Sequence, residues 1–125
     1  MNENTFEKLH AWEEAHKFVL MLYKETKRFP TEEKYRLGDQ IRRAGASVAA
    51  NLVEGNARLS KKEYLQFVNH AKGSLEETKY HLLLAKDLGY LDEKLYNALI
   101  EQSQVVGKLI AGLLKYLQTL INQSR

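Results

Sequence analysis

Apolar side chains recur at steps of three and four residues through four stretches of the chain, a spacing that places them on one face of an α-helix. The first stretch predicts a helix at about residues 6–28. It ends before Pro30, because a residue that precedes proline is pushed out of the helical region. Its apolar stripe comprises Leu9, Trp12, Ala15, Val19, Leu22 and Thr26, widened by Phe18 and Tyr23.

The second stretch predicts one continuous helix at about residues 32–54. Thr31 is expected to cap its first turn, and the acidic pair that follows suits the positive N-terminal end of a helix. Gly45 lies inside this helix, where glycine costs about 1 kcal/mol relative to alanine. We therefore expect a neighbouring backbone to approach closely there, and we expect Gly55-Asn56 to close the helix. The apolar stripe is Leu37, Ile41, Ala44, Val48 and Leu52.

The third predicted helix spans about residues 61–88. Ser60 and Glu63 form the S/T-x-x-E pattern of a capping box at its start, and Gly89 is expected to stop it. Gly73 interrupts the pattern midway and again predicts tight packing. Apolar positions include Leu65, Val68, Leu75, Leu82 and Leu88, with Tyr64, Phe67 and Ala71 beside them.

The fourth predicted helix spans about residues 93–121, with Asp92 as its cap. From Val106 onward its apolar steps alternate between four and three, as in a coiled-coil seam. Further apolar residues, Val105 and Tyr116 among them, make the helix apolar over more than one stripe. Such a helix is buried on two sides, so we infer a subunit interface on it.

Four helices joined by short loops predict an all-α fold, an antiparallel up-down-up-down four-helix bundle that forms a single domain over residues 1–125. A chain of this length can bury a hydrophobic core without disulfides or structural metals. The absence of cysteine excludes disulfides, thiolate metal sites and a cysteine nucleophile. Residues 1–20 lack the apolar core of a signal peptide, and no run approaches the length of a membrane span. A cytoplasmic location without membrane contact is the expectation.

Charge is distributed unevenly along the chain. The formal net charge is +3, yet residues 34–62 alone hold seven bases against two acids. Such asymmetry favours a polyanionic partner. The alternative is that these charges sit on solvated helix faces and in ion pairs between helices.

Catalytic chemistry has little support in the sequence. The E-x-x-H pattern of di-metal bundles occurs twice, as Glu7 with His10 and as Glu13 with His16. Both copies fall on the first predicted helix, whereas such a site needs one copy on each of two facing helices. A metal-dependent enzyme is therefore only a third hypothesis. We expect no catalytic residues, no metal and no cofactor.

The candidate contacts to nucleic acid are basic side chains in and after the second predicted helix. Consecutive positions of a helix point about 100° apart, so at most one of Arg42 and Arg43 faces the core. The alternative, which we favour for one of the two arginines, is that Arg42 or Arg43 pairs with Glu54, Glu76 or Glu77 across helices. Tyr64, Tyr80, Tyr90, Tyr96 and Tyr116 are candidates for base stacking, although aromatics at helical spacing are more often core residues. The basic candidates are Arg42, Arg43, Arg58, Lys61, Lys62 and Lys72.

Several of these residues carry a resemblance to a known family. The sequence resembles the four-helix-bundle proteins encoded in intervening sequences of bacterial 23S rRNA genes, the S23 family. Its departures are Gly45 and Val53, where the family usually has alanine, and Lys72, where it often has arginine. The matching positions are Trp12, Ala15, Phe29-Pro30, Gln40-Ile41-Arg42-Arg43-Ala44, Ser47-Val48, Asn51, Glu54-Gly55, Arg58, Ser60, Glu63, Phe67, Lys72-Gly73-Ser74-Leu75-Glu76-Glu77 and Gly89-Tyr90-Leu91.

The resemblance implies a left-turning antiparallel bundle that assembles into a ring-shaped homopentamer. The sequence is also similar to the accessory protein of diversity-generating retroelements, a basic pentamer that works with a reverse transcriptase and binds nucleic acid. On this resemblance Arg42, Arg43, Arg58 and Lys72 are candidate nucleic-acid contacts. A polar structural set between helices or subunits would comprise Asn51, Glu54, Ser74 and Glu76.

Two functions are therefore expected ahead of the metal enzyme. The first is a non-enzymatic, oligomeric bundle that binds structured RNA or DNA through a basic surface around residues 42–62. The second is a scaffold or adaptor for a protein partner, whose arginines serve in salt bridges between subunits.

Overall fold

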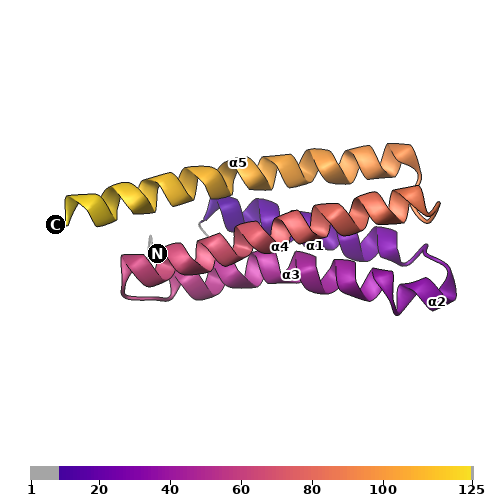
Figure 1. The fold of residues 1–125 in the computed structure, drawn as a ribbon, viewed down its shortest axis with the longest axis horizontal. Helices are drawn as coiled ribbons and strands as arrows, with labels where there is room; N and C mark the ends of the chain where they lie inside the picture. The colour runs from indigo at the N-terminus through magenta and orange to yellow at the C-terminus, as the bar shows by residue number, and fades with distance from the viewer. Residues whose placement is uncertain (1–8, 125) are drawn as a thin grey trace.

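A computed structural model describes residues 9–124, which form four long helices and one short one (Figure 1). The helices pack as an up-down bundle, and the predicted all-α fold class is confirmed. In chain order the elements are α1 (His10–Thr26), α2 (Thr31–Lys34), α3 (Leu37–Asn56), α4 (Lys61–Asp87) and α5 (Glu93–Gln123). The first residues of the helix predicted at 6–28 lie partly outside the described range.

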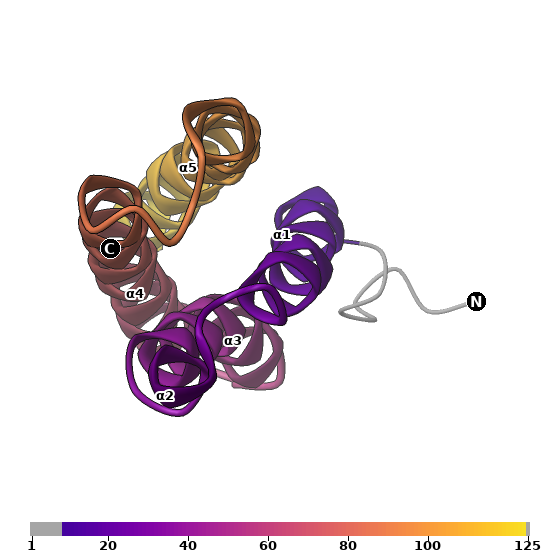
Figure 2. The same ribbon diagram turned by 90° about the vertical axis from the view of Figure 1, so that its right-hand side faces the viewer.

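The four long helices surround one core. Seen from the end, α1, α3, α4 and α5 follow one another around the bundle (Figure 2), and α3 packs between α1 and α4. α5 packs on α4 and α1 and runs past the ends of its neighbours at its C-terminus (Figure 1). None of the helices in the described part of the chain is long and apolar enough to cross a membrane.

The predicted apolar stripes match the core most closely in α3, where all five predicted positions are buried. In α1 the buried face is rotated from the predicted one, because Phe18 is fully buried whereas Val19 is only partly buried. In α4 the prediction fails at Leu88, which follows the helix and is 52% exposed.

Local signals at the ends of α4 and α5 are confirmed. The Ser60 hydroxyl accepts the Glu63 amide at 3.3 Å, and the Asp92 carboxylate accepts the Leu95 amide at 2.8 Å. Gly89 ends α4 with a φ of +85°, in the left-handed region that favours glycine. The amides of Gly89 and Tyr90 return to the carbonyls of Lys86 and Ala85, the hydrogen-bond pattern of a Schellman motif.

The second predicted helix is wrong in its continuity, because Tyr35 and Arg36 separate α2 from α3. Thr31 is not the cap either: Pro30 precedes the first turn, and no side chain caps it. The Lys34 carbonyl, which would accept an amide of the next turn in a continuous helix, instead accepts the Arg42 guanidinium at 2.6 Å. A long-range side-chain contact thus takes the place of a helical hydrogen bond.

The three glycines whose packing or helix-ending role was predicted, Gly45, Gly55 and Gly73, have different environments. A Cβ on Gly45 would collide with Leu22 of α1, so close packing is confirmed, although the neighbour is a side chain rather than a backbone. α3 ends at Asn56, as the pair Gly55-Asn56 predicts, although Gly55 itself still lies inside the helix. A Cβ on Gly55 would come within 2.9 Å of Phe67 and Tyr64 of α4. Tight packing at Gly73 was the wrong expectation, because no atom lies within 4 Å of a Cβ placed there.

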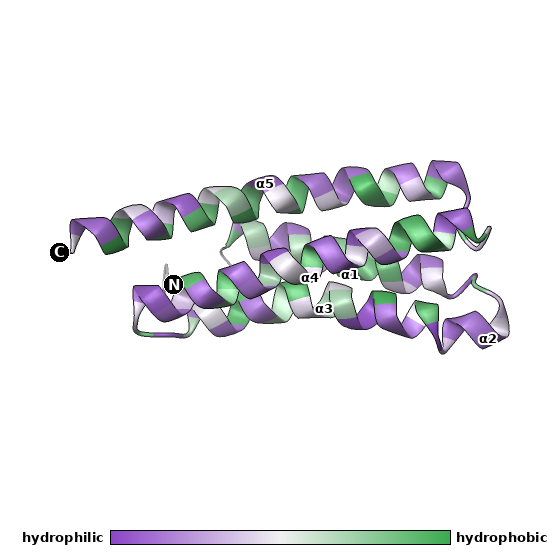
Figure 3. Ribbon diagram, in the orientation of Figure 1, coloured by the Kyte–Doolittle hydropathy of each residue, from purple (hydrophilic) through white to green (hydrophobic). Residues whose placement is uncertain are grey.

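α5 carries more apolar surface than this bundle covers. Apolar segments recur along its whole length (Figure 3), and Val105 and Tyr116 are 39% and 59% exposed. The predicted subunit interface on this helix stays a prediction.

Candidate nucleic-acid interface

Three of the predicted basic residues gather where α3 passes into α4. α3 ends at Asn56, and α4 begins at Lys61 after its cap Ser60. Arg58 lies on the short connection, Lys61 and Lys62 lie in the first turn of α4, and all three are exposed. Gly55 lets α3 and α4 approach closely just before the turn. The Arg58 guanidinium lies over the Phe67 ring, 4.6 Å from its centroid, so its position is held by a cation–π contact. We call Arg58, Lys61 and Lys62 the junction cations.

Two of the junction cations, Arg58 and Lys61, border a cavity of about 440 Å³ that also reaches the C-terminal half of α5. Burial raises the pKa of the Tyr64 hydroxyl in its wall. No carboxylate occurs among the described residues that line the cavity, so its charge favours an anion. The lining comprises Leu9, Asn56, Ala57, Arg58, Leu59, Lys61, Tyr64, Leu113, Tyr116 and Leu117.

Arg42 lies near the N-terminal end of α3, far from the junction cations, and serves the fold. Its guanidinium donates to the Thr26 hydroxyl of α1 at 3.0 Å and to the Lys34 carbonyl at 2.6 Å. It also lies 5.9 Å from the Tyr23 ring centroid, and its side chain is only 19% exposed. Arg42 therefore ties the end of α1 to α2 and α3.

Arg43 is the arginine that reaches solvent, with 81% of its side chain exposed. Both arginines pair with Asp39 of their own helix, Arg43 at 3.2 Å and Arg42 at 3.8 Å. The expected pairing of either arginine with Glu54, Glu76 or Glu77 is wrong for this chain. Glu76 instead pairs with Lys79, and Glu77 lies 3.4 Å from His81.

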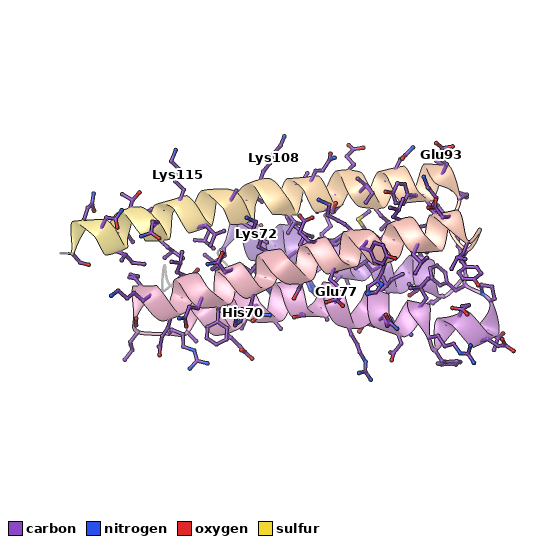
Figure 4. All side chains as sticks on the ribbon, in the orientation of Figure 1. His70, Lys72, Glu77, Glu93, Lys108 and Lys115 are labelled. Atoms are coloured by element: carbon purple, nitrogen blue, oxygen red, sulfur yellow. The ribbon has the colours of Figure 1, made fainter. Side chains whose placement is uncertain are left out.

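Lys72 lies apart from the other predicted cations. It is exposed on α4 eleven residues after Lys61, which corresponds to about 16 Å along the helix axis. In the view of Figure 4 it lies on the α5 side of α4, whereas His70 lies on the α3 side. The structure therefore does not bring Lys72 together with the junction cations.

Two members of the predicted polar set meet between α3 and α4. The Ser47 and Ser74 hydroxyls lie 2.9 Å apart across the helices, and the Asn51 amide donates to the Ser47 hydroxyl at 3.0 Å and to its carbonyl at 2.8 Å. Asn51 and Ser74 are thus connected through Ser47. Glu54 and Glu76 are exposed and lie outside this network.

A second basic pocket was missed in the sequence. It occupies about 280 Å³ beside the break between α2 and α3, and its lining comprises Tyr23, Lys27, Lys34, Tyr35 and Arg42. The signal was present as a tyrosine flanked by two bases, Lys34-Tyr35-Arg36. We call this hollow the tyrosine pocket. Of the tyrosines that were named as stacking candidates, Tyr80 and Tyr116 are exposed and Tyr64 is buried.

Groups of three or more acidic or histidine side chains that could hold a metal ion do not occur within residues 9–124. The E-x-x-H copy that contains Glu7 lies partly outside that range. The copy at Glu13 and His16 lies on α1, and the His16 ring stacks on Trp12 at a centroid distance of 5.1 Å.

Fold and site together define a small all-α bundle protein whose basic side chains gather at the connections between its helices. The sequence matches the 23S rRNA-intervening sequence protein family over residues 7–112, and the chain belongs to that family.

A solved structure with the same fold comes from Bacteroides thetaiotaomicron VPI-5482, a protein with unknown function from the S23 ribosomal protein family. It shares 24% sequence identity with this chain at a TM-score of 0.78, and the alignment covers 84% of this chain and 98% of that one. This likeness concerns the fold alone. No functionally curated protein matches the sequence.

Proposed function

We propose that this protein is a non-enzymatic, oligomeric bundle that binds structured nucleic acid through the junction cations and Arg43. The observation that carries the proposal is the exposed cluster of Arg58, Lys61 and Lys62 beside a cavity without a carboxylate in its described lining. Exposed cations are available to phosphates, and each phosphate contact releases counterions. Arg43 is included because 81% of its side chain is exposed and its ion pair with Asp39 lies at the surface. Arg42 is left out of the interface because its donors are engaged within the bundle.

The test is the binding of a labelled structured RNA and of a matched DNA duplex across a salt series. The triple variant Arg58→Ala, Lys61→Ala, Lys62→Ala should lower the affinity and reduce the slope of log K against log salt by up to about 3. The matched control removes three cations of α5, Lys94, Lys108 and Lys115, of which the last two point away from the bundle (Figure 4). Equal effects of the two triple variants would refute a localised interface.

A scaffold that binds a protein partner is the second candidate, and the exposed apolar surface of α5 favours it. In that case Arg43 and Arg58 would form salt bridges between subunits. Their substitution would then dissociate the oligomer, as measured by light scattering, and the wild type would bind no nucleic acid even at low salt. The nucleic-acid proposal predicts the opposite pair of results.

The oligomer itself is part of the proposal. The apolar surface on α5 supports association, and the family resemblance implies a ring of five subunits. Light scattering of the full chain at several protein concentrations measures the subunit number directly. A monomer at every concentration would refute this part and leave the binding test intact.

A further inference from the structure

The tyrosine pocket lies near the break between α2 and α3 and combines exposed aromatic rings with cations. Tyr23 and Tyr35 are 45% and 76% exposed, and Lys27, Lys34 and Arg42 complete the lining. No carboxylate belongs to the described lining. Arg42 forms an ion pair with Asp39, but Asp39 lies outside the lining and also pairs with Arg43. The pocket therefore favours a ligand that is both anionic and flat.

The fold holds this pocket in shape without a ligand. Phe29 is buried and packs against Tyr90, which fixes the turn that leads from α1 to α2. Arg42 then binds the end of α1 through Thr26 and the end of α2 through the Lys34 carbonyl. The same guanidinium lies near the Tyr23 ring, so Arg42 and Tyr23 already hold their places in the pocket before a ligand binds.

The size of the pocket limits the ligand. Sites for drug-sized molecules begin at roughly 300 Å³, and a hollow of about 280 Å³ suits a single planar ring rather than a folded peptide segment. Tyrosine rings stack on nucleobases irrespective of sequence, while lysines that flank the rings attract the phosphates on either side of the base.

We propose that the tyrosine pocket binds one unpaired nucleotide of a nucleic acid. Its base stacks on Tyr23 or Tyr35, and Lys27 and Lys34 contact the adjoining phosphates. This inference rests on the proposed nucleic-acid function and adds to it a preference for structures that present an unpaired base. The junction cations supply affinity for phosphates of any sequence, whereas the tyrosine pocket distinguishes looped from fully paired ligands.

The test compares two labelled DNA hairpins with the same stem, one closed by unpaired purines and one closed by a linker without bases. Wild-type protein should bind the purine loop about 5- to 150-fold more tightly, the range expected for one stacked base. The double variant Tyr23→Leu, Tyr35→Leu should reduce this preference to less than twofold and leave the affinity for the linker hairpin unchanged. Tyr35→Phe should retain the preference, because it keeps the ring.

The matched control is Tyr80→Leu, which removes a tyrosine of similar exposure from α4 and should leave the preference intact. Equal affinity of the wild type for both hairpins would overturn the pocket proposal while leaving the proposed function in place. A preference that survives the double variant would overturn it in the same way. If neither hairpin binds at low salt, either as DNA or as RNA with the same stem sequence, the proposed function fails, and the pocket proposal fails with it.

Discussion

Arg42 and Arg43 are neighbours in sequence with opposite roles, and this difference can be measured. The Arg42 guanidinium makes two hydrogen bonds to other parts of the chain at 3.0 and 2.6 Å, and 19% of its side chain is exposed. A hydrogen bond that involves a charged group is worth about 1.5–3 kcal/mol. Two such bonds come to about 3–6 kcal/mol. Because water reaches the partly exposed side chain and the ion pair to half-exposed Asp39 adds little, we expect Arg42→Ala to lower the free energy of unfolding by the lower part of this range, about 3–4 kcal/mol.

Arg43→Ala is the matched control, because the same side chain is removed one position away. Its side chain is 81% exposed and its one ion pair is at the surface, so the expected change is below about 0.5 kcal/mol. Urea unfolding followed by circular dichroism at equal protomer concentration gives both values. Arg42→Lys should fall between them, since one ammonium cannot reach both acceptors. Equal losses for the two alanine variants would refute the assignment of Arg42 to the fold.

Three further substitutions test the packing at two glycines and the effect of burial on Tyr64. Gly45→Ala should destabilise the protein by about 1–3 kcal/mol, because its methyl group would collide with buried Leu22; urea unfolding measures the loss. Gly73→Ala should raise the free energy of unfolding by about 0.5–1 kcal/mol, because the site is open; a loss accompanied by dissociation in light scattering would instead place Gly73 against another subunit. Burial raises the pKa of Tyr64, so the folded state keeps the phenol proton to a higher pH than the unfolded state does. The free energy of unfolding should therefore fall as pH rises above about 10. Tyr64→Phe should show a smaller fall in unfolding experiments at pH 9–11.

Features of the fold that depend on neighbouring residues in sequence could be predicted. Ser60, Asp92 and Gly89 act within three residues of their own position, as caps or in a left-handed turn, and each was placed correctly. The break before α3 could not be predicted, because its cause is remote. The Lys34 carbonyl accepts the Arg42 guanidinium instead of an amide of the next helical turn. The position of that guanidinium depends in turn on Thr26 at the end of α1.

The glycines also separate local features, which the sequence predicts, from long-range contacts, which it does not. The sequence shows that a glycine lies inside a predicted helix, but it does not show which neighbour faces that glycine. Gly45 faces a leucine of α1, Gly55 faces two aromatic residues of α4, and Gly73 faces open space in the single chain. Close packing was therefore correct for Gly45 and wrong for Gly73, although both lie inside predicted helices.

The candidate site could be predicted in part for a related reason. Arg58, Lys61 and Lys62 are close in sequence and joined by a short connection, so their proximity follows from the chain itself. Lys72 lies three turns further along the helix and is separated from them. The tyrosine pocket brings Tyr23 of α1 together with Tyr35, and the intervening turn at Pro30 hides that proximity from helical periodicity.

The two basic regions lie near opposite ends of α3, and their separation gives a last prediction. Twenty residues of α-helix span about 30 Å, which equals about nine base pairs of DNA at 3.4 Å each. A hairpin whose loop occupies the tyrosine pocket therefore needs a stem of about nine base pairs to reach Arg58 and Lys61 of the same chain. Stems of five and twelve pairs should bind with different salt slopes, and the triple alanine variant of the junction cations should lower the slope only for the longer stem. An equal reduction for both stems would contradict simultaneous contact at the two ends.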